Sequence, residues 1–479
     1  MNQNLSSTDV AALSPLLILL VGALVMLLIE SFAKENIKKL CALLCLGIIG
    51  VALAAAIAAP ISSNPLLTPW LYFDQIARFF TIFFLCIGLV FTLLSISFFQ
   101  RFEASQGEYY FLLLSALFGL ILIGASADFL TLFLGIEILA ISLYVFCGYM
   151  KAWQTSSEAA IKYFLMGALA TAFLLYGIAL VYGAVGTTRF DELLGGYQNI
   201  ALNQNKMLFL SGIALITLGL SFEAAVVPFQ VWAPDVYAGA STPVTAFMAV
   251  GTKVGAFAAF VRIFMDALPQ FDPFWNQGVA LLAYPTLIYA NFVALRQVQM
   301  RRFFAYSGIS HAGFLLIPLA AGTPDALQAL MFYLVIYAIA TSGAFAVLTF
   351  LDKSSEGVML KDLYGLFKRS PVLAAILALC LLTLAGIPPT AGFFAKFYIF
   401  KVAFEAEFYG LVIVGLLTTI LSAFYYLRMV GVMFSEAPAE SEAPAKSWSA
   451  GLVGFCAAVV IVIISCYPKP LMDLILAAS

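Results

Sequence analysis

Charged residues are scarce in this chain. Of its 479 residues, Asp, Glu, Lys and Arg make up only 10%, against about 25% in an ordinary soluble domain. Hydrophobic residues make up 63%, more than a water-facing surface can carry. A soluble enzyme is therefore excluded. The net charge of −2, without a large basic patch, argues against nucleic acid as a partner.

Signatures of cofactor sites are missing too. The chain has one histidine and seven cysteines, none in a CxxC pair, so no cluster for iron–sulfur, haem or zinc is expected. A Walker A motif and a strand–GxGxxG–helix unit are both absent, which argues against a nucleotide site. We expect the cysteines to be small buried side chains, and no metal or cofactor to bind this chain.

Apolar runs of roughly 20 residues recur along the whole chain, which predicts an all-α polytopic membrane protein. The strands of an outer-membrane barrel would alternate apolar and polar residues, and these runs do not. The longest polar segments are 186–206, 352–370 and 435–446, so no soluble domain is expected. The last of them is Ala/Pro/Glu-rich and predicts a flexible loop, and an apolar tail at 470–478 is expected along the interface. About 14 transmembrane helices are predicted, at 12–32, 39–60, 75–99, 110–126, 128–149, 158–184, 208–232, 243–265, 275–295, 303–321, 324–351, 371–400, 404–434 and 447–467.

Lysine and arginine predict the orientation of these spans. Thirteen of them lie in loops after odd-numbered spans, against about four after even-numbered spans. Because cytoplasmic loops carry the excess of positive charge, both termini are expected on the non-cytoplasmic side. The polar, acidic N-terminus predicts neither a signal peptide nor a transit peptide.

Ionisable residues inside the predicted spans are the candidate site. A charge near the bilayer centre costs roughly 2.5–3.5 kcal/mol, so such residues need a reason. A low dielectric disfavours the charged forms of lysine and glutamate, and such groups can exchange protons near neutral pH. The pattern therefore predicts a proton pathway across the membrane. The candidates are Glu137, Lys162, Glu223, Lys253, His311 and Lys396.

Structural roles remain open for some of these candidates. Lys162 follows Glu158 by four residues, so a simple i,i+4 pair near the interface would explain it. His311 would also fit a neutral, hydrogen-bonded contact between helices. A structural ion pair is a weaker explanation for Glu137, Glu223 and Lys253, because they lie too deep to reach water easily.

Two spans contain helix-breaking residues. Span seven carries Pro228 and Pro234, and span twelve carries Gly386, Pro388 and Pro389. Proline removes a backbone hydrogen bond, and the freed carbonyls can hold ions or water. Spans seven and twelve are five apart, as are spans five and ten, which predicts two inverted five-helix repeats. The expected units are an N-terminal three-helix segment (1–109), two repeats (110–265 and 266–434), and a loop with a last helix (435–479).

At these residues the chain resembles a known family, the antiporter-like membrane subunits of bacterial NADH:quinone oxidoreductase (respiratory complex I), and most closely its subunit N type. The resemblance covers essentially the whole chain, and the first three helices favour a bacterial source. The matching stretches are LFLGIEILAISLYVFCGY, SSEAAIKYFLMGALATAFLLYGIALVYG, VPFQVWAPDVYAGASTPVTAFMAVGTKVGAF, RRFFAYSGISHAGFLL and LTLAGIPPTAGFFAKFYIF.

The resemblance implies a function and assigns roles by position. Glu137, Lys162, Lys253 and Lys396 match the family's ionisable residues of helices five, six, eight and twelve, and His311 falls on its helix-ten motif. The family moves protons while other subunits transfer electrons from NADH to quinone through flavin and iron–sulfur clusters. The implied partners are other membrane-arm subunits, including further antiporter-like chains, in a bacterial inner membrane.

One departure from the family lies in span seven. Glu223 stands where the family usually has a lysine, and Gln230 replaces its histidine. We hypothesise that Glu223 is neutral at rest, or pairs with Lys253, and still relays protons; the competing hypothesis is an impaired first half-channel. Alternative functions are a subunit of a multisubunit cation/proton antiporter, a subunit of a ferredoxin- or hydrogenase-linked membrane complex, or a scaffold of the membrane arm.

Overall fold

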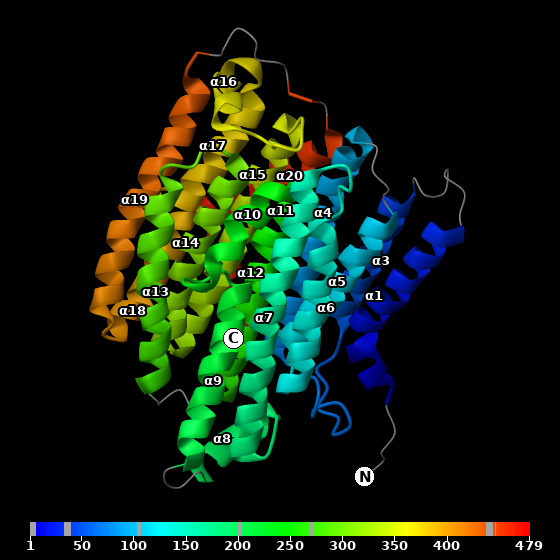
Figure 1. The fold of residues 1–479 in the computed structure, drawn as a ribbon, viewed down its shortest axis with the longest axis vertical. Coiled ribbons are helices and arrows are strands. Elements are labelled where there is room, and N and C mark those ends of the chain that lie inside the picture. The colour runs from blue at the N-terminus through cyan, green and yellow to red at the C-terminus, as the bar shows by residue number, and fades with distance from the viewer. Residues whose placement is uncertain are drawn as a thin grey trace.

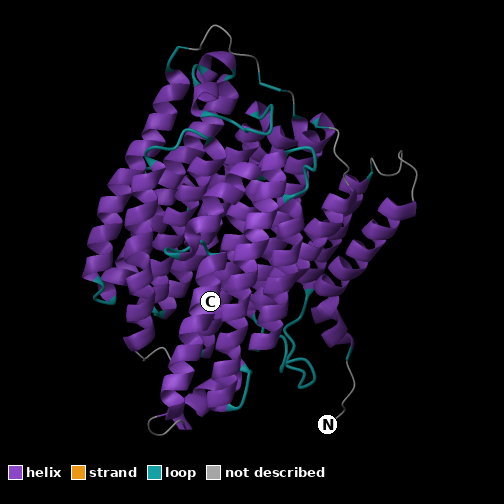
Figure 2. Ribbon diagram, in the orientation of Figure 1, coloured by secondary structure: helices purple, strands orange, loops and turns teal. Residues whose placement is uncertain are grey.

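Long α-helices and their connecting loops make up the computed structural model (Figure 2). The structure describes residues 6–32, 40–102, 107–199, 204–268, 273–436, 444–445 and 447–479. In a lipid environment each backbone N–H and C=O needs a partner inside the protein, and an α-helix supplies that partner within one segment. The apolar runs of the sequence therefore become helices.

Thirteen helices of the described chain are long and apolar enough to cross a membrane. The prediction of an all-α polytopic fold is thereby confirmed. These helices are α1 (Ser7–Phe32), α3 (Cys41–Ala58), α4 (Gln75–Arg101), α5 (Gly107–Ala125), α6 (Phe129–Cys147), α7 (Gln154–Val185), α9 (Gln204–Glu223), the segment Thr242–Ala267, α13 (Pro273–Ala294), α14 (Met300–Ala321), α15 (Pro324–Leu351), α19 (Tyr409–Phe434) and α20 (Trp448–Cys466).

Both expected helix breaks are present. Span seven consists of α9, a break, a 3-10 turn η1 (Phe229–Val231) and α10 (Trp232–Gly239). Span twelve, the fourteenth expected crossing, consists of two half-helices, α17 (Pro371–Ala385) and α18 (Ala391–Glu405). Each half-helix is too short to cross alone, which is why span twelve is absent from the thirteen.

Two of the polar connecting segments contain short helices. Segment 186–206 contains the helix α8 (Phe190–Asn199), and segment 352–370 contains η4 (Leu360–Leu363) and α16 (Leu366–Arg369). Most of segment 435–446 lies outside the described residues. The apolar tail forms the short helix α21 (Lys469–Ala478).

The centre of the bundle is built from two helices that are buried along their whole length, span eight and α14. Span eight, Thr242–Ala267, alternates between α-helical and π-helical winding as α11 (Thr242–Phe247), η2 (Met248–Thr252), α12 (Lys253–Phe260) and η3 (Val261–Ala267). In Figure 1 its segments α11 and α12 lie in the middle of the bundle, between the outer helices. Most groups on these two helices are therefore shielded from lipid, whereas Arg302 and Asp266 near the helix ends are partly exposed.

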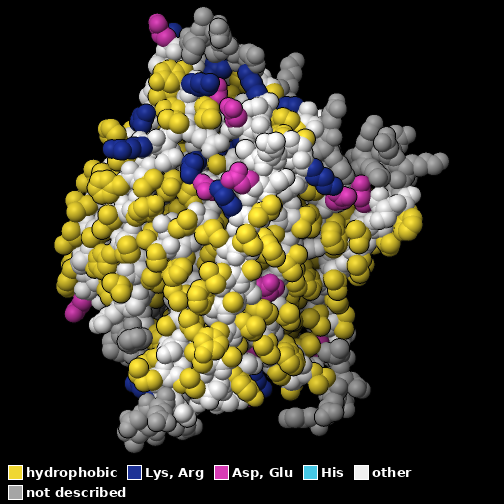
Figure 3. All heavy atoms as spheres, in the orientation of Figure 1, with side chains coloured by type: hydrophobic (Ala, Val, Ile, Leu, Met, Phe, Trp, Pro, Cys, Tyr) yellow, Lys and Arg dark blue, Asp and Glu magenta, His cyan; other side chains and the backbone are white. Residues whose placement is uncertain are grey.

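Side-chain type divides the surface into zones. Figure 3 shows a broad hydrophobic zone across the visible face of the bundle, with most of the visible Lys and Arg toward the end that carries α16. The helix α8 and the N-terminal side of α1 lie at the opposite end (Figure 1). The expected unit boundaries, after residues 109, 265 and 434, fall within a few residues of helix ends and stay a prediction.

Candidate functional site

The break in span seven exposes backbone carbonyls inside the bundle. The helix α9 ends at Glu223, Ala225 takes a left-handed conformation with φ of 56°, and the peptide bond before Pro228 is cis. The last carbonyls of a helix have no partner within it. One of them, that of Ala224, accepts a hydrogen bond from Nζ of Lys253 at 3.3 Å. Only 2% of Lys253 is exposed, so its amine meets a backbone dipole in place of water.

The break in span twelve repeats this geometry at matching positions. Gly386 is left-handed with φ of 78° where the first break has Ala225, and the peptide bond before Pro389 is cis. The preceding carbonyl, that of Ala385, accepts from Nζ of Lys396 at 3.0 Å. The two breaks therefore offer a lysine the same carbonyl, but span eight supplies the lysine at the first break and α18 supplies it at the second.

Glu223 lies beside the first break without a partner of opposite charge. It is 9% exposed, and its Oε2 has no hydrogen-bond partner among the described residues. Within 4 Å no ion pair joins Glu223 to Lys253 in the described chain, since the lysine turns to the carbonyl of Ala224. Glu137 is the charged group with which Glu223 interacts electrostatically. The Oε1 of buried Gln230 also lacks a partner there.

Glu137 lies on α6 and accepts a hydrogen bond from Thr171 Oγ1 on α7 at 2.6 Å. It is partly exposed at the edge of the bundle, whereas Glu223 is enclosed. The two carboxyl groups thus connect the rim of the first repeat with the break.

His311 is hydrogen-bonded on both ring nitrogens. Its Nδ1 lies 2.8 Å from the hydroxyl of Tyr333, and its Nε2 lies 3.1 Å from that of Tyr426. The histidine on α14 thereby joins α15 to α19, which confirms the expected hydrogen-bonded contact between helices. Tyr426 continues the chain of hydroxyls to Ser307 at 2.5 Å.

Two close approaches connect Lys253 to His311 and then to Lys396. A Cβ placed on Gly308 would lie 3.3 Å from the hydroxyl of Tyr337 and 3.6 Å from Nζ of Lys253, so these groups meet at one point of α14. A small cavity of about 10 Å³ is lined by His311, Tyr337 and Lys396, among others. That volume is near the lower limit for one water molecule. The buried groups therefore form a line from the first break to the second.

Lys162 does not lie on this line. It forms ion pairs with Glu158 at 2.7 Å and with Asp235 at 3.2 Å, and 44% of its side chain is exposed. The expected i,i+4 pair is thus confirmed, and Lys162 lies about two turns from the start of α7 at Gln154. Asp235 also pairs with Arg302 at 2.7 Å.

Some of these participants gave no signal in the sequence. Tyrosines in apolar runs, such as Tyr333, Tyr337 and Tyr426, look like core residues. Asp235 follows the break in WAPDVYAG and could have been found as a charge within an apolar stretch.

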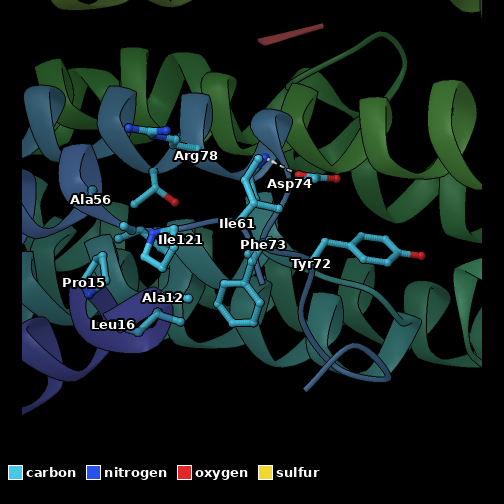
Figure 4. Close-up of a pocket in the computed structure, with 15 residues that line it drawn as sticks. Ala12, Pro15, Leu16, Ala56, Ile61, Tyr72, Phe73, Asp74, Arg78 and Ile121 are labelled. Atoms are coloured by element: carbon cyan, nitrogen blue, oxygen red, sulfur yellow. Dashed lines mark hydrogen bonds between the residues drawn. The ribbon is translucent and has the colours of Figure 1, made fainter. Parts of the chain in front are cut away.

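An ion pair between a buried arginine and a partly exposed aspartate ties the N-terminal helices to span eight. Arg262 is fully buried and holds Asp74, at the start of α4, through two hydrogen bonds of 2.7 Å. Burial alone would raise the pKa of Asp74, but the hydrogen bonds and charge of Arg262 lower it below its ordinary range. Asp74 also borders a cavity of about 50 Å³ (Figure 4), whose apolar lining includes Leu16 and Ile61. None of the six candidates lines this cavity, which belongs to the packing of α1, α3 and α4.

Among the described residues, no group of three or more His, Cys, Asp or Glu side chains is placed to hold a metal ion. The groups that line the site are amines, carboxyls, hydroxyls and one imidazole, which bind and release protons.

Comparisons with known proteins agree with this arrangement. The family described as "NADH:quinone oxidoreductase/Mrp antiporter, TM" matches residues 126–422. A protein of Protochlamydia amoebophila named NADH-quinone oxidoreductase subunit N is 63% identical over 478 residues, covering 99% of each chain. Its namesake in Chloroflexus aggregans is 38% identical over 475 residues, covering 98% of this chain and 96% of that one.

Solved structures show the same fold. A chain of respiratory complex I from Thermus thermophilus, with bound aureothin, superposes with a TM-score of 0.81 at 31% identity, covering 96% of this chain and 98% of that one. A chain of the Mrp complex from Dietzia, 21% identical, gives a TM-score of 0.83 over 98% of this chain and 97% of that one, which shows the fold alone. The chain therefore belongs to the family of antiporter-like membrane subunits shared by NADH:quinone oxidoreductases and Mrp antiporters.

Proposed function

We propose that this chain is the proton-translocating membrane-arm subunit, of subunit N type, in a bacterial NADH:quinone oxidoreductase. The observation that carries this proposal is the full-length match to relatives of that name, together with the buried line of proton-binding groups. Electron transfer from NADH to quinone, through flavin and iron–sulfur clusters, then takes place in other subunits. This subunit contributes to the oxidoreductase without a redox site of its own.

The proposed route runs through the two breaks. A proton reaches Lys253 at the carbonyl of Ala224, passes the hydroxyl of Tyr337 to the imidazole of His311, and continues to Lys396 at the carbonyl of Ala385. The histidine can exchange a proton through either ring nitrogen because both meet tyrosine hydroxyls. A backbone carbonyl favours a protonated lysine without holding it as tightly as a carboxylate would, so the proton remains transferable.

Glu223 serves this route as a neutral carboxyl group at rest. A buried carboxylate with no cation beside it would be costly, and a carboxylic acid is the cheaper form. Glu137, by contrast, is partly exposed and accepts a hydrogen bond from Thr171. Two carboxyl groups that share a low-dielectric site do not both ionise readily.

Orientation follows from the distribution of charge. We place the α16 end, where Lys and Arg gather in Figure 3, at the cytoplasm of a bacterial inner membrane. The N-terminal side of α1 then lies at the opposite, non-cytoplasmic end, and we place the C-terminus on that side too.

Composition of the native complex tests the proposal. A tagged copy, purified in mild detergent, should bring down flavin and iron–sulfur subunits together with further antiporter-like chains. Redox subunits that use ferredoxin or hydrogen would move the assignment to a related membrane complex. Small membrane subunits without redox partners would make the chain part of a cation/proton antiporter.

A further inference from the structure

A buried charge cluster lies at the α16 end of the bundle, away from the proton line. Asp352, directly after α15, is fully buried and accepts a hydrogen bond from Thr242, the first residue of span eight. Arg301 at the start of α14 is 1% exposed and donates to the carbonyls of Ala240 and Ser355. The cluster thus joins three helix ends and the loop that follows α15.

Four polar atoms of this cluster have no hydrogen-bond partner in the described structure. They are Oδ1 of Asp352, Nε of Arg301, Nη2 of Arg101 and Oγ of Ser241. Arg101 already donates from its other nitrogen to the carbonyl of Asp352 at 2.7 Å, so its guanidinium lies at the same place. Buried polar groups without partners are rare.

Arg301 and Arg101 are the charged groups that act electrostatically on Asp352, and both favour its carboxylate form. Burial raises the pKa of Asp352 above its ordinary range, while Arg301 and the hydrogen bond from Thr242 oppose that rise. The carboxyl group can therefore take up a proton at a higher pH than an ordinary aspartate.

Two hydroxyl groups on α15 lie near Lys253, on the side that faces this cluster. Thr242 and Lys253 lie on the same helix, about 16 Å apart at 1.5 Å per residue. On the neighbouring helix α15, Thr341 is buried and its Oγ1 also lacks a partner among the described residues. Four residues before it on α15, Tyr337 donates to the carbonyl of Ala249 at 2.9 Å and approaches Lys253.

We propose that Asp352 is the proton acceptor of an inlet between span eight and α15 that supplies Lys253. A proton leaves water at the α16 end and binds Oδ1 of Asp352. It then passes through ordered water and the hydroxyls of Thr341 and Tyr337 to the neutral amine of Lys253, and Asp352 returns to the carboxylate. The two arginines repel metal cations, whereas a proton can move along hydrogen bonds. The inlet rests on the proposed function and orientation.

The test is Asp352→Asn in the complete complex, reconstituted in proteoliposomes. Asparagine keeps an oxygen acceptor for Thr242 but cannot carry a proton. We expect the ratio of protons to electrons to fall to the level of Lys253→Ala. The double variant Asp352→Asn with Lys253→Ala should show no further fall in this ratio. Asp352→Glu should restore the ratio. The matched control is Glu356→Gln, an exposed acidic residue on the same loop, which should leave the ratio unchanged.

A second variant keeps the test decisive if Asp352→Asn fails to assemble. Thr341→Val removes a hydroxyl from the route at nearly constant volume and leaves the arginine cluster intact, so it should also lower the ratio. Suppose that Lys253→Ala lowers the ratio of protons to electrons. A wild-type ratio in Asp352→Asn would then overturn the inlet, and so would a wild-type ratio in Thr341→Val if Asp352→Asn does not assemble. If Lys253→Ala also pumps normally, the proposed function itself fails.

Discussion

Replacing Gly386 by alanine should displace Lys396 from its carbonyl without touching the lysine itself. Gly386 has φ of 78°, and a Cβ added there would lie 2.7 Å from Cδ and 3.3 Å from Cε of Lys396. Carbon atoms do not approach so closely, so the flexible lysine chain must move. Its Nζ then loses the carbonyl of Ala385, now 3.0 Å away.

The structure sets the size of the effect. A left-handed alanine costs roughly 1–2 kcal/mol of stability, which a subunit with this many buried contacts should tolerate. A lost hydrogen bond from a charged group costs about 1.5–3 kcal/mol, which lowers the population of the resting lysine geometry roughly ten- to hundredfold. We therefore expect assembly to survive and pumping through this subunit to fall sharply.

The assay is proton uptake per electron transferred, in proteoliposomes that contain the whole complex. Quinone reduction in the presence of a protonophore reports whether the redox subunits remain intact. The matched control is Ala225→Gly at the corresponding position of the first break. That change adds no atom, and glycine adopts the left-handed conformation with φ of 56° more easily than alanine does. Pumping should therefore be unchanged.

A double variant shows whether the reasoning is right. Lys396→Ala should itself lower pumping more than assembly. In that background the overlap no longer exists, so adding Gly386→Ala should cause little further loss. A normal ratio in the single variant, or a large additional loss in the double variant, would refute displacement of the lysine as the cause.

Three further changes probe other contacts. Gly308→Val should block transfer at Lys253, because even a Cβ there lies 3.6 Å from Nζ; normal pumping would disprove that contact's role. Arg262→Gln should lower the thermal stability of the complex by roughly 2–3 kcal/mol, since it leaves Asp74 without its buried partner. The pKa of Asp74 is lowered in the fold, so this stabilisation is present at neutral pH and is lost as pH falls below about 4; equal acid sensitivity with and without Arg262 would contradict it. Glu223→Lys should not raise the proton-to-electron ratio, and a rise would mean that the native carboxyl is a handicap.

The two helix breaks show how far sequence reasoning reaches. Pro228 in span seven and Pro389 in span twelve predict interrupted helices, and the structure confirms both. The sequence could not show that each break ends in a left-handed residue, because Ala225 is not a residue that favours this conformation. It also could not show which lysine reaches which carbonyl.

Lys162 and Asp352 show what the position of a charge along the chain leaves open. Lys162 looks like a member of the pathway, but it lies in partly exposed ion pairs with Glu158 and Asp235. Asp352 looks like a loop residue after a helix, but it is fully buried between two arginines. Depth along a helix can be read from sequence, whereas the direction a side chain faces depends on its neighbours.

Composition and periodicity by themselves determined that this chain is a bundle of membrane helices, because 63% apolar residues in long runs have no other stable arrangement in water or lipid. They also identified Glu223, Lys253 and Lys396 as ionisable groups inside the bundle. Only the tertiary structure decided that Lys253, His311 and Lys396 form one line while Lys162 stands apart. The reason is physical: the line is made by tyrosine hydroxyls, freed carbonyls and a glycine contact between helices distant in sequence, and none of these carries a pattern that sequence can display.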